Sequence, residues 1–261
     1  MFNDDYELAA NSALTKVSFL KKDNLGYFIS SMFAGFLVGC GMMLIYTIAG
    51  VMEGSPGMKI IQGVSFTMPL SLIVIAGCDL FTGNNFTMAA GVLKKRITVI
   101  DGLILWVVCY LGNFAGSIFG GAIFNYTGLA YGATLKAMNA AIIYKTSPDA
   151  LQLFCRGVMC NIFVCAGVWC SYRAKSEAGK LIMIFWCMYA FIICGYEHCV
   201  ANMTLFAIGV ISPAMENISV NAMANNLIFV TLGNIAGGVL LALIYYFIAR
   251  SQAKQPVKKN R

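Results

Sequence analysis

Two polar segments, GCDLFTGNN at residues 77–85 and GYEHCVAN at residues 195–202, interrupt two long apolar runs. The runs extend over residues 60–92 and 180–211, whereas one helix needs about 20 residues to cross the roughly 30 Å hydrocarbon core of a bilayer. Irregular backbone is tolerated at membrane depth only where it lines a cavity or is buried in protein. The two interruptions therefore predict a path through the membrane that is lined by two broken helices.

The composition indicates that most of the chain lies in lipid. Of the 261 residues, 59% are hydrophobic and 11% are charged, whereas about a quarter of a soluble domain is charged. Four further apolar runs lie roughly at residues 27–52, 101–126, 149–172 and 226–249. We therefore expect an all-α membrane protein with six spanning segments, built as a single channel domain over residues 1–261.

The distribution of positive charge predicts the orientation. The net charge of +7 comes from short clusters between apolar runs, not from one folded face, so nucleic acid is not an expected partner. Six spans put both termini on one side of the bilayer, and only Lys59, Lys136, Lys145 and Arg156 fall on or near the other side. The positive-inside rule thus predicts a multi-pass protein of the inner membrane with both termini in the cytoplasm.

The two ends of the chain are expected to be cytoplasmic segments. Residues 1–25 are amphipathic and are predicted to lie along the membrane interface. The apolar face comprises Leu8, Ala9, Ala13, Leu14, Val17 and Leu20, and the basic face comprises Lys16, Lys21 and Lys22. No cleavable signal peptide is expected, because this segment contains no continuous apolar stretch. Residues 250–261 form a basic tail.

Two pairs of motifs indicate an internal repeat. LGNFAG at residues 111–116 matches LGNIAG at 232–237 with an offset of 121, and the two polar interruptions match with an offset of 117 to 118. Each half then holds three spans. Because three is odd, the second half must be inserted upside down relative to the first, as in channels and transporters with inverted repeats.

The polar residues of the interruptions are the candidates for chemistry. His198 is the only histidine of the chain, and an ionisable group inside a membrane is a functional candidate by default. Asp79 and Glu197 occupy matching positions, and we expect them to accept backbone or amide hydrogen bonds, because a carboxylate facing the path would repel an anion. Thr82 can offer a hydroxyl at the first break. Glycines permit the tight backbone, and the N-termini of half-helices attract anions.

Other classes of protein fit the sequence less well. A neutral-solute channel of the aquaglyceroporin type would share inverted repeats, but the NPA motif that it requires is absent. A membrane enzyme, a metal site or an electron carrier would need paired histidines or clustered ligands, and ten cysteines spread through the apolar runs supply neither. We therefore expect no enzyme activity, no metal and no cofactor. Acidic rings would favour a cation channel, which reversal potentials would test.

Four stretches closely resemble the formate/nitrite transporter family over essentially the whole chain. They are DLFTG at 79–83, CNIFVCAGVW at 160–169, GYEHCVANMTLF at 195–206 and VTLGN at 230–234. The resemblance is nearer to the nitrite channel branch than to the formate channel branch. It implies an aquaporin-like protomer with its own pore, assembled as a symmetric homopentamer. It also implies a channel for small monovalent anions, among which nitrite, hydrosulfide and formate make similar demands.

The same resemblance implies roles for eight residues of the path, and Glu197 joins them through its position beside His198. The path comprises His198, Thr82, Lys145, Leu70, Leu80, Phe191, Asn161, Asn202 and Glu197. The first would be the central histidine, with Thr82 as its partner, and Lys145 would concentrate anions outside the pore. Leu70 and Phe191 would form a constriction toward the periplasm and Leu80 one toward the cytoplasm, with Asn161 and Asn202 as braces.

The role of His198 in transport is open at this stage. Its ring can donate a proton so that the neutral acid crosses, or it can stay neutral and act as a hydrogen-bond donor. Burial disfavours a charged imidazole while an adjacent anion favours it, and the sequence does not rank these effects.

Overall fold

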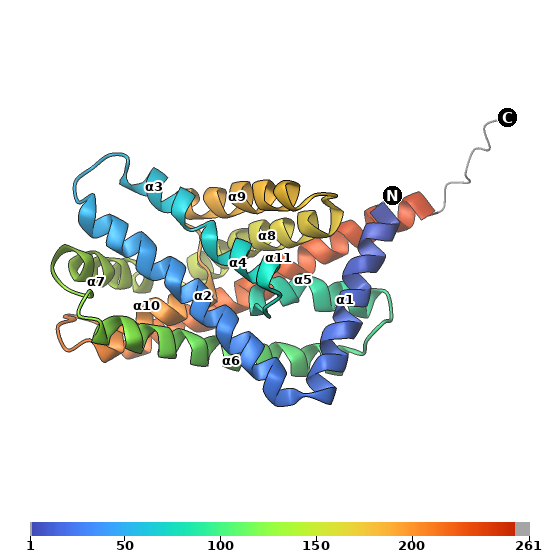
Figure 1. The fold of residues 1–261 in the computed structure, drawn as a ribbon, viewed down its shortest axis with the longest axis horizontal. Helices are drawn as coiled ribbons and strands as arrows, with labels where there is room; N and C mark the ends of the chain where they lie inside the picture. Colours follow the sequence, from blue (N-terminus) through green and yellow to red (C-terminus); the bar gives the residue numbers. More distant parts are fainter. Residues whose placement is uncertain (1, 254–261) are drawn as a thin grey trace.

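The computed structural model describes residues 2–253, and every regular element among them is a helix. The helices are α1 (Phe2–Lys22), α2 (Asn24–Val51), α3 (Met58–Ser65), α4 (Met68–Ala76), α5 (Phe81–Leu93), α6 (Val99–Tyr126), α7 (Gly132–Thr146), α8 (Ala150–Arg173), α9 (Glu177–Cys194), α10 (Cys199–Ile211) and α11 (Val220–Ala253). Most run side by side along the long axis, with α1 crossing one end of the bundle and α7 lying at the other (Figure 1). The predicted basic tail lies largely outside the described residues.

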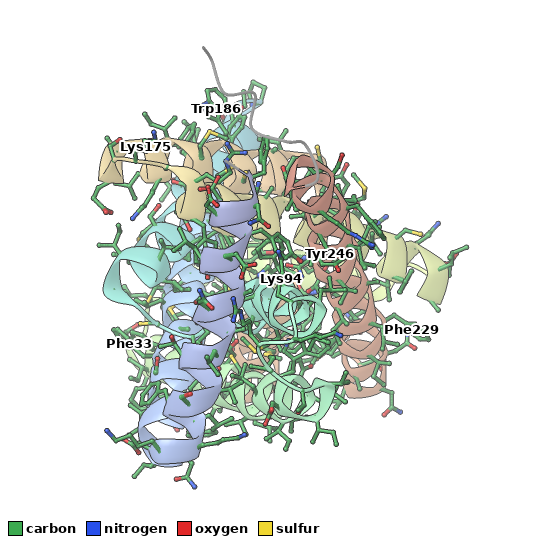
Figure 2. The ribbon with its side chains drawn as sticks, turned by 90° about the vertical axis from the view of Figure 1, so that its right-hand side faces the viewer. Phe33, Lys94, Lys175, Trp186, Phe229 and Tyr246 are labelled. Atoms are coloured by element: carbon green, nitrogen blue, oxygen red, sulfur yellow. The ribbon has the colours of Figure 1, made fainter. Side chains whose placement is uncertain are left out.

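Six apolar helical stretches in the described part of the chain are long enough to cross a membrane. They coincide with the six predicted runs, so the chain is a membrane protein. Large apolar side chains point outward around the bundle, including Phe33 and Trp186, which are 47% and 57% exposed (Figure 2). An outer surface of this kind is stable in lipid and not in water.

Polar caps set where several helices begin. The Asp23 carboxylate accepts a hydrogen bond from the Gly26 amide at the start of α2, and the hydroxyl of Ser176 does the same for α9. Thr98 and Asp101 form a reciprocal capping box at the start of α6. Such caps satisfy amides that have no partner inside the helix.

Glycines bring helices into close contact within the chain. A Cβ on Gly116 of α6 would lie 1.8 Å from the Met32 carbonyl oxygen of α2, and one on Gly233 of α11 would lie 2.2 Å from the Phe154 carbonyl oxygen of α8. Only residues without a side chain allow backbones to approach so closely. These glycine faces of α6 and α11 therefore pack against other helices of the same chain.

The position of α1 along the membrane interface stays a prediction, and its predicted apolar face is only partly correct. The helix packs on the bundle: Tyr6 and Ala10 are fully buried, and the Tyr6 hydroxyl donates to the Ala242 carbonyl oxygen of α11 at 3.0 Å. Leu8 and Leu14, which were assigned to its apolar face, are 55% and 45% exposed. The burial of a large aromatic side chain against α5, α8 and α11 fixes the rotation of the helix instead.

Helix α7 was not predicted, since its residues lie between two spans and carry weak periodicity. Its side chains Met138 and Ile142 are fully buried, and it packs against α2, α10 and α11. It ends close to Lys145, so this lysine is held on a helix and not on a loop.

Candidate functional site

The first polar interruption separates α4 from α5. Helix α4 ends at Ala76, and Gly77 follows with a φ of 77° in the left-handed region. Leu80 is extended, with φ −102° and ψ 126°, and caps the start of α5. A left-handed residue costs little only at glycine, which explains why the chain turns here.

The second interruption repeats this backbone between α9 and α10. Gly195 has a φ of 75°, and His198 is extended with φ −116° and ψ 115°. The residue that occupies the N-cap therefore differs, leucine in the first break and histidine in the second, while the path of the backbone is the same.

Asn113 of α6 braces the first break. Its Oδ1 accepts a hydrogen bond from the Phe81 amide at 2.8 Å, and its Nδ2 donates to the carbonyl oxygens of Asp79 and Ser31 at 3.0 and 2.6 Å. These bonds satisfy backbone groups that the break leaves without helical partners, as a membrane interior requires.

Asn234 of α11 braces the second break in the same way. Its Oδ1 accepts from the Cys199 amide at 2.9 Å, and its Nδ2 donates to the carbonyl oxygens of Glu197 and Gly157 at 3.0 and 2.8 Å. The two LGN motifs of the sequence thus supply the two braces.

A closed polar ring surrounds the second break. The Lys145 ammonium lies 2.9 Å from Glu197 Oε2, and Asn202 Nδ2 donates to the same oxygen at 2.7 Å. Asn202 Nδ2 also donates to Asn226 Oδ1 at 2.8 Å, and Asn226 Nδ2 donates to the Lys145 carbonyl oxygen at 2.7 Å. The carboxylate is 1% exposed, and its charge is balanced by the lysine.

The first break carries a corresponding set. Asp79 forms an ion pair with Lys16 of α1 and accepts a hydrogen bond from Asn84 Nδ2 at 3.1 Å. Asn84 Nδ2 also donates to the Tyr27 hydroxyl at 3.2 Å. Asn84 of the first break therefore has the same role as Asn202 of the second, because the side-chain amide of each donates to the carboxylate of its break. The expectation that both carboxylates accept amide hydrogen bonds is confirmed; the lysine partners were not predicted.

The side chain of His198 extends from the second break toward the first. Its Nδ1 accepts a hydrogen bond from the Ala201 amide at 3.2 Å, and its Nε2 lies 3.0 Å from Thr82 Oγ1. Because Nδ1 is an acceptor, the neutral ring carries its proton on Nε2. The ring is 4% exposed and stacks on Phe191 with centroids 6.1 Å apart. It therefore presents one N–H donor, opposite the hydroxyl of the other broken helix.

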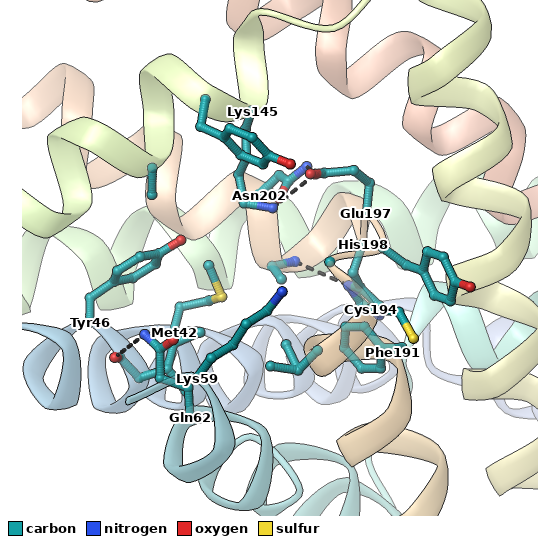
Figure 3. A pocket seen from close by; sticks show the side chains of 17 residues that line it. Met42, Tyr46, Lys59, Gln62, Lys145, Phe191, Cys194, Glu197, His198 and Asn202 are labelled. Atoms are coloured by element: carbon teal, nitrogen blue, oxygen red, sulfur yellow. Dashed lines mark hydrogen bonds and ion pairs between the residues drawn. The ribbon is translucent and has the colours of Figure 1, made fainter. Parts of the chain in front are cut away.

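A cavity of about 300 Å³, here called the Lys145 cavity, opens on one side of this histidine (Figure 3). Its polar lining comprises Tyr46, Lys59, Gln62, Tyr144, Lys145, Cys194, Tyr196, Glu197, His198 and Asn202. A second cavity of about 400 Å³, the Lys16 cavity, is lined by Lys16, Asp79, Asn84 and residues of α4, α5 and α8.

A small central pocket lies between the two cavities and shares lining residues with both. Its volume is about 10 Å³, and its lining includes Leu70, Leu80, Phe191 and His198. Phe191 and His198 also line the Lys145 cavity, and Leu70 and Leu80 also line the Lys16 cavity. A space of this size holds at most about one water, so the narrow part is closed to a hydrated ion. Leu70 lines this pocket together with Phe191, and it also borders the Lys16 cavity together with Leu80.

Comparison with known proteins now identifies the family. A family model described as "Formate/nitrite transporter" matches residues 4–248. The chain belongs to the formate/nitrite transporter family. The sequence is 35% identical to "Nitrite transporter NirC" of Escherichia coli, over 98% of this chain and 96% of the relative. It is 33% identical to "Formate channel FocA" of Haemophilus influenzae, over 82% of each chain.

Solved structures agree with this assignment. An "FNT family ion channel" superposes with a TM-score of 0.89 at 32% identity, covering 94% of this chain and 98% of that one. A "Pentameric formate channel with formate bound" gives a TM-score of 0.78 at 28% identity, covering 88% and 99%. The relatives are transporters and channels, and this formate/nitrite transporter is accordingly a membrane channel for small anions.

Within this formate/nitrite transporter, all nine sequence-predicted residues lie at the two breaks, the central pocket or the Lys145 cavity. Asn161 Nδ2 donates to the carbonyl oxygens of Thr82 and Asn234 at 3.2 and 2.6 Å and to Asn85 Oδ1 at 3.0 Å. Sequence reasoning missed the bracing and charge-balancing residues Lys16, Asn84, Asn113, Asn226 and Asn234. The repeated LGN motif was a usable signal for two of these asparagines.

Proposed function

We propose that the chain conducts small monovalent anions through the central pocket, with the Nε2–H of His198 as the donor that an anion meets on the way. The observation that carries this proposal is the placement of that N–H between two cavities whose buried carboxylates are both paired with lysines. Pairing removes the negative charge that would otherwise repel an anion, and leaves a single directed donor at the narrowest place.

Of the two roles for His198, we favour the neutral donor. A second proton on the ring would have to go to Nδ1, which already accepts the Ala201 amide. Two N–H groups would then face each other, and the cap of α10 would be lost at a cost of about 1 kcal/mol. A neutral ring that keeps this cap can donate from Nε2 to Thr82 when the pocket is empty and to an anion when one enters.

The path runs from one end of the bundle to the other. An anion enters the Lys145 cavity, passes Phe191, meets His198 and leaves between Leu70 and Leu80 toward the Lys16 cavity. Two apolar constrictions slow hydrated ions of either sign, and the single donor offsets the loss of water for an anion only. The closed pocket requires small side-chain movements to pass even a dehydrated anion.

The finer assignments follow from the same proposal. Nitrite is the first substrate to test, with hydrosulfide and formate next, because the relatives include a nitrite transporter and a formate channel. We propose a homopentamer in the inner membrane, with both termini cytoplasmic and the Lys145 cavity facing the periplasm. The matched breaks, braces and lysine pairs support two inversely inserted halves of three spans each.

The test is flux through purified protein in liposomes. Nitrite, formate and hydrosulfide are compared for the wild type, His198→Phe and His198→Asn between pH 5 and pH 8. We expect His198→Phe to lower flux at least tenfold, while His198→Asn, which retains a cap acceptor and an N–H donor, keeps a measurable part of it. Wild-type flux and pH dependence in His198→Phe would remove the histidine from the mechanism.

A current measurement separates the two roles of the histidine. Passage of the anion itself carries charge, so planar bilayers in a nitrite gradient should show a current with an anion-selective reversal potential. Uptake without any current would favour crossing as the neutral acid, and a cation-selective reversal potential would overturn the proposal altogether.

A further inference from the structure

The charged groups that line the Lys145 cavity do not balance. Three charged side chains line it: Lys59, Lys145 and Glu197. Lys145 and Glu197 are 2.9 Å apart and neutralise each other. A net charge of about +1 therefore remains, and it belongs to Lys59.

The position of Lys59 suits a role at the mouth. It lies in the first turn of α3 and is exposed, and its side chain extends toward the centre of the cavity (Figure 3). Its Nζ is 4.0 Å from the place that a Cβ on Gly195 would occupy, so the ammonium lies beside the second break. Within residues 2–253 it has no ion-pair partner.

The Lys16 cavity lacks an equivalent charge. Its charged lining residues are Lys16 and Asp79, which form an ion pair with each other. The two mouths therefore have the same paired lysine and carboxylate, and differ by one ammonium.

We propose that Lys59 is the anion-capturing residue of the Lys145 mouth and makes this mouth faster to load than the opposite one. The inference rests on the proposed anion conduction. A lysine paired with a carboxylate has a field that falls off steeply, whereas an unpaired charge in a cleft raises the local concentration of anions and their rate of association. Lys145 then holds the break together through Glu197, and Lys59 attracts the anion.

The expected magnitude is modest and depends on salt. A unit charge about 8 Å from an anion in water changes its local concentration about twofold to threefold. Screening lengths are about 10 Å at 0.1 M salt and about 3 Å at 1 M. The effect should therefore be present at low ionic strength and absent at 1 M.

The experiment measures initial nitrite flux or current from each side of a bilayer at low anion concentration. Lys59→Gln should lower loading from the Lys145 side about twofold to threefold at low salt, Lys59→Glu should lower it further, and Lys59→Arg should retain the wild-type value. The matched control is Lys136→Gln, a lysine 78% exposed that pairs with Glu53 outside the cavity, which should have no effect.

The outcomes distinguish the inference from the proposed function. Equal flux in Lys59→Gln and Lys136→Gln, or an effect that persists unchanged at 1 M salt, would overturn the role of Lys59 while leaving anion conduction intact. A wild-type protein that passes no anion at all would overturn the proposed function itself. An unfolded Lys59→Gln would show as loss of flux from both sides, and Lys59→Arg then carries the comparison.

Discussion

The two helix breaks have nearly the same scaffold but differ at one side chain. Both begin with a left-handed glycine, both are braced by an asparagine of an LGN motif, and both place a carboxylate between a lysine and an asparagine amide. The residue that caps the following half-helix is Leu80 in one and His198 in the other. The scaffold stabilises the irregular backbone of both breaks, and the proposed chemistry lies where the two breaks differ.

The breaks also differ in the origin of their lysine. Lys145 comes from α7, whose backbone is itself tied to α11 through Asn226, whereas Lys16 comes from α1, which crosses the opposite end of the bundle. The same balance of charge is therefore achieved by two unrelated helices. The two breaks thus share the paired carboxylate but not the helix that supplies its lysine.

The largest effect is expected from removing a lysine that balances a carboxylate. Lys145→Ala leaves Glu197 buried and unpaired beside the path, which costs about 3–5 kcal/mol when a fully buried pair is broken and repels an arriving anion. We expect nitrite flux in liposomes to fall at least tenfold. The double variant Lys145→Ala with Glu197→Gln should regain flux, because no unpaired charge remains.

The equivalent variant at the other break is the comparison. Lys16→Ala should also lower flux and should be rescued by Asp79→Asn, if the two pairs have the same role. Failure of rescue at either end, with the protein still folded by size-exclusion chromatography, would show that the lysine acts directly on the anion and not through its carboxylate.

Much of this scaffold was predictable because it depends on local signals. Length and apolar runs predicted the six spans, and the repeated GCD and GYE segments located both breaks. The amide bonds accepted by Asp79 and Glu197 were also predicted correctly, since an unpaired carboxylate is not tolerated in a membrane interior. These features follow from residues close together in the sequence.

A second effect should be of intermediate size and should fall on stability. Asn113→Ala and Asn234→Ala each leave a buried amide and two carbonyl groups without their partner, at a cost of about 1–3 kcal/mol for an unsatisfied group. Melting in detergent should show a similar decrease for both. Asn234 braces the break that carries His198, so nitrite flux should fall further in Asn234→Ala than in Asn113→Ala. Equal losses of flux in the two variants would contradict a division between scaffold and chemistry.

Among the variants at the two breaks, the smallest effect is expected from the hydroxyl that faces the histidine. Thr82→Val removes the partner of Nε2 but keeps the shape of the side chain, so we expect a change in nitrite flux of about fivefold or less, well below that of His198→Phe. Thr47→Val is the control, because the Thr47 hydroxyl donates only to the Met43 carbonyl oxygen of its own helix. A loss as large as that of His198→Phe would mean that the hydroxyl, and not the imidazole, is the essential donor.

What the sequence did not reveal depends on contacts between distant segments. Lys16 reads as part of the polar face of an amphipathic helix, and its partner Asp79 is 63 residues away. Tertiary structure likewise determines the hydrogen bond between Asn113 and the Phe81 amide. It also determines the packing that makes residues 132–146 a helix. Lys59 belongs to no recognisable motif, and only its position in the lining of the Lys145 cavity indicates a role.

The position of α1 has a consequence for biogenesis. This helix is made before α11 and nevertheless contacts it: the Tyr6 hydroxyl donates to the Ala242 carbonyl oxygen, and Tyr6 packs with Leu241 and Trp169 in one cluster. The part of its docking site that α11 supplies therefore exists only once α11 has been made, so α1 can complete its packing only late in assembly.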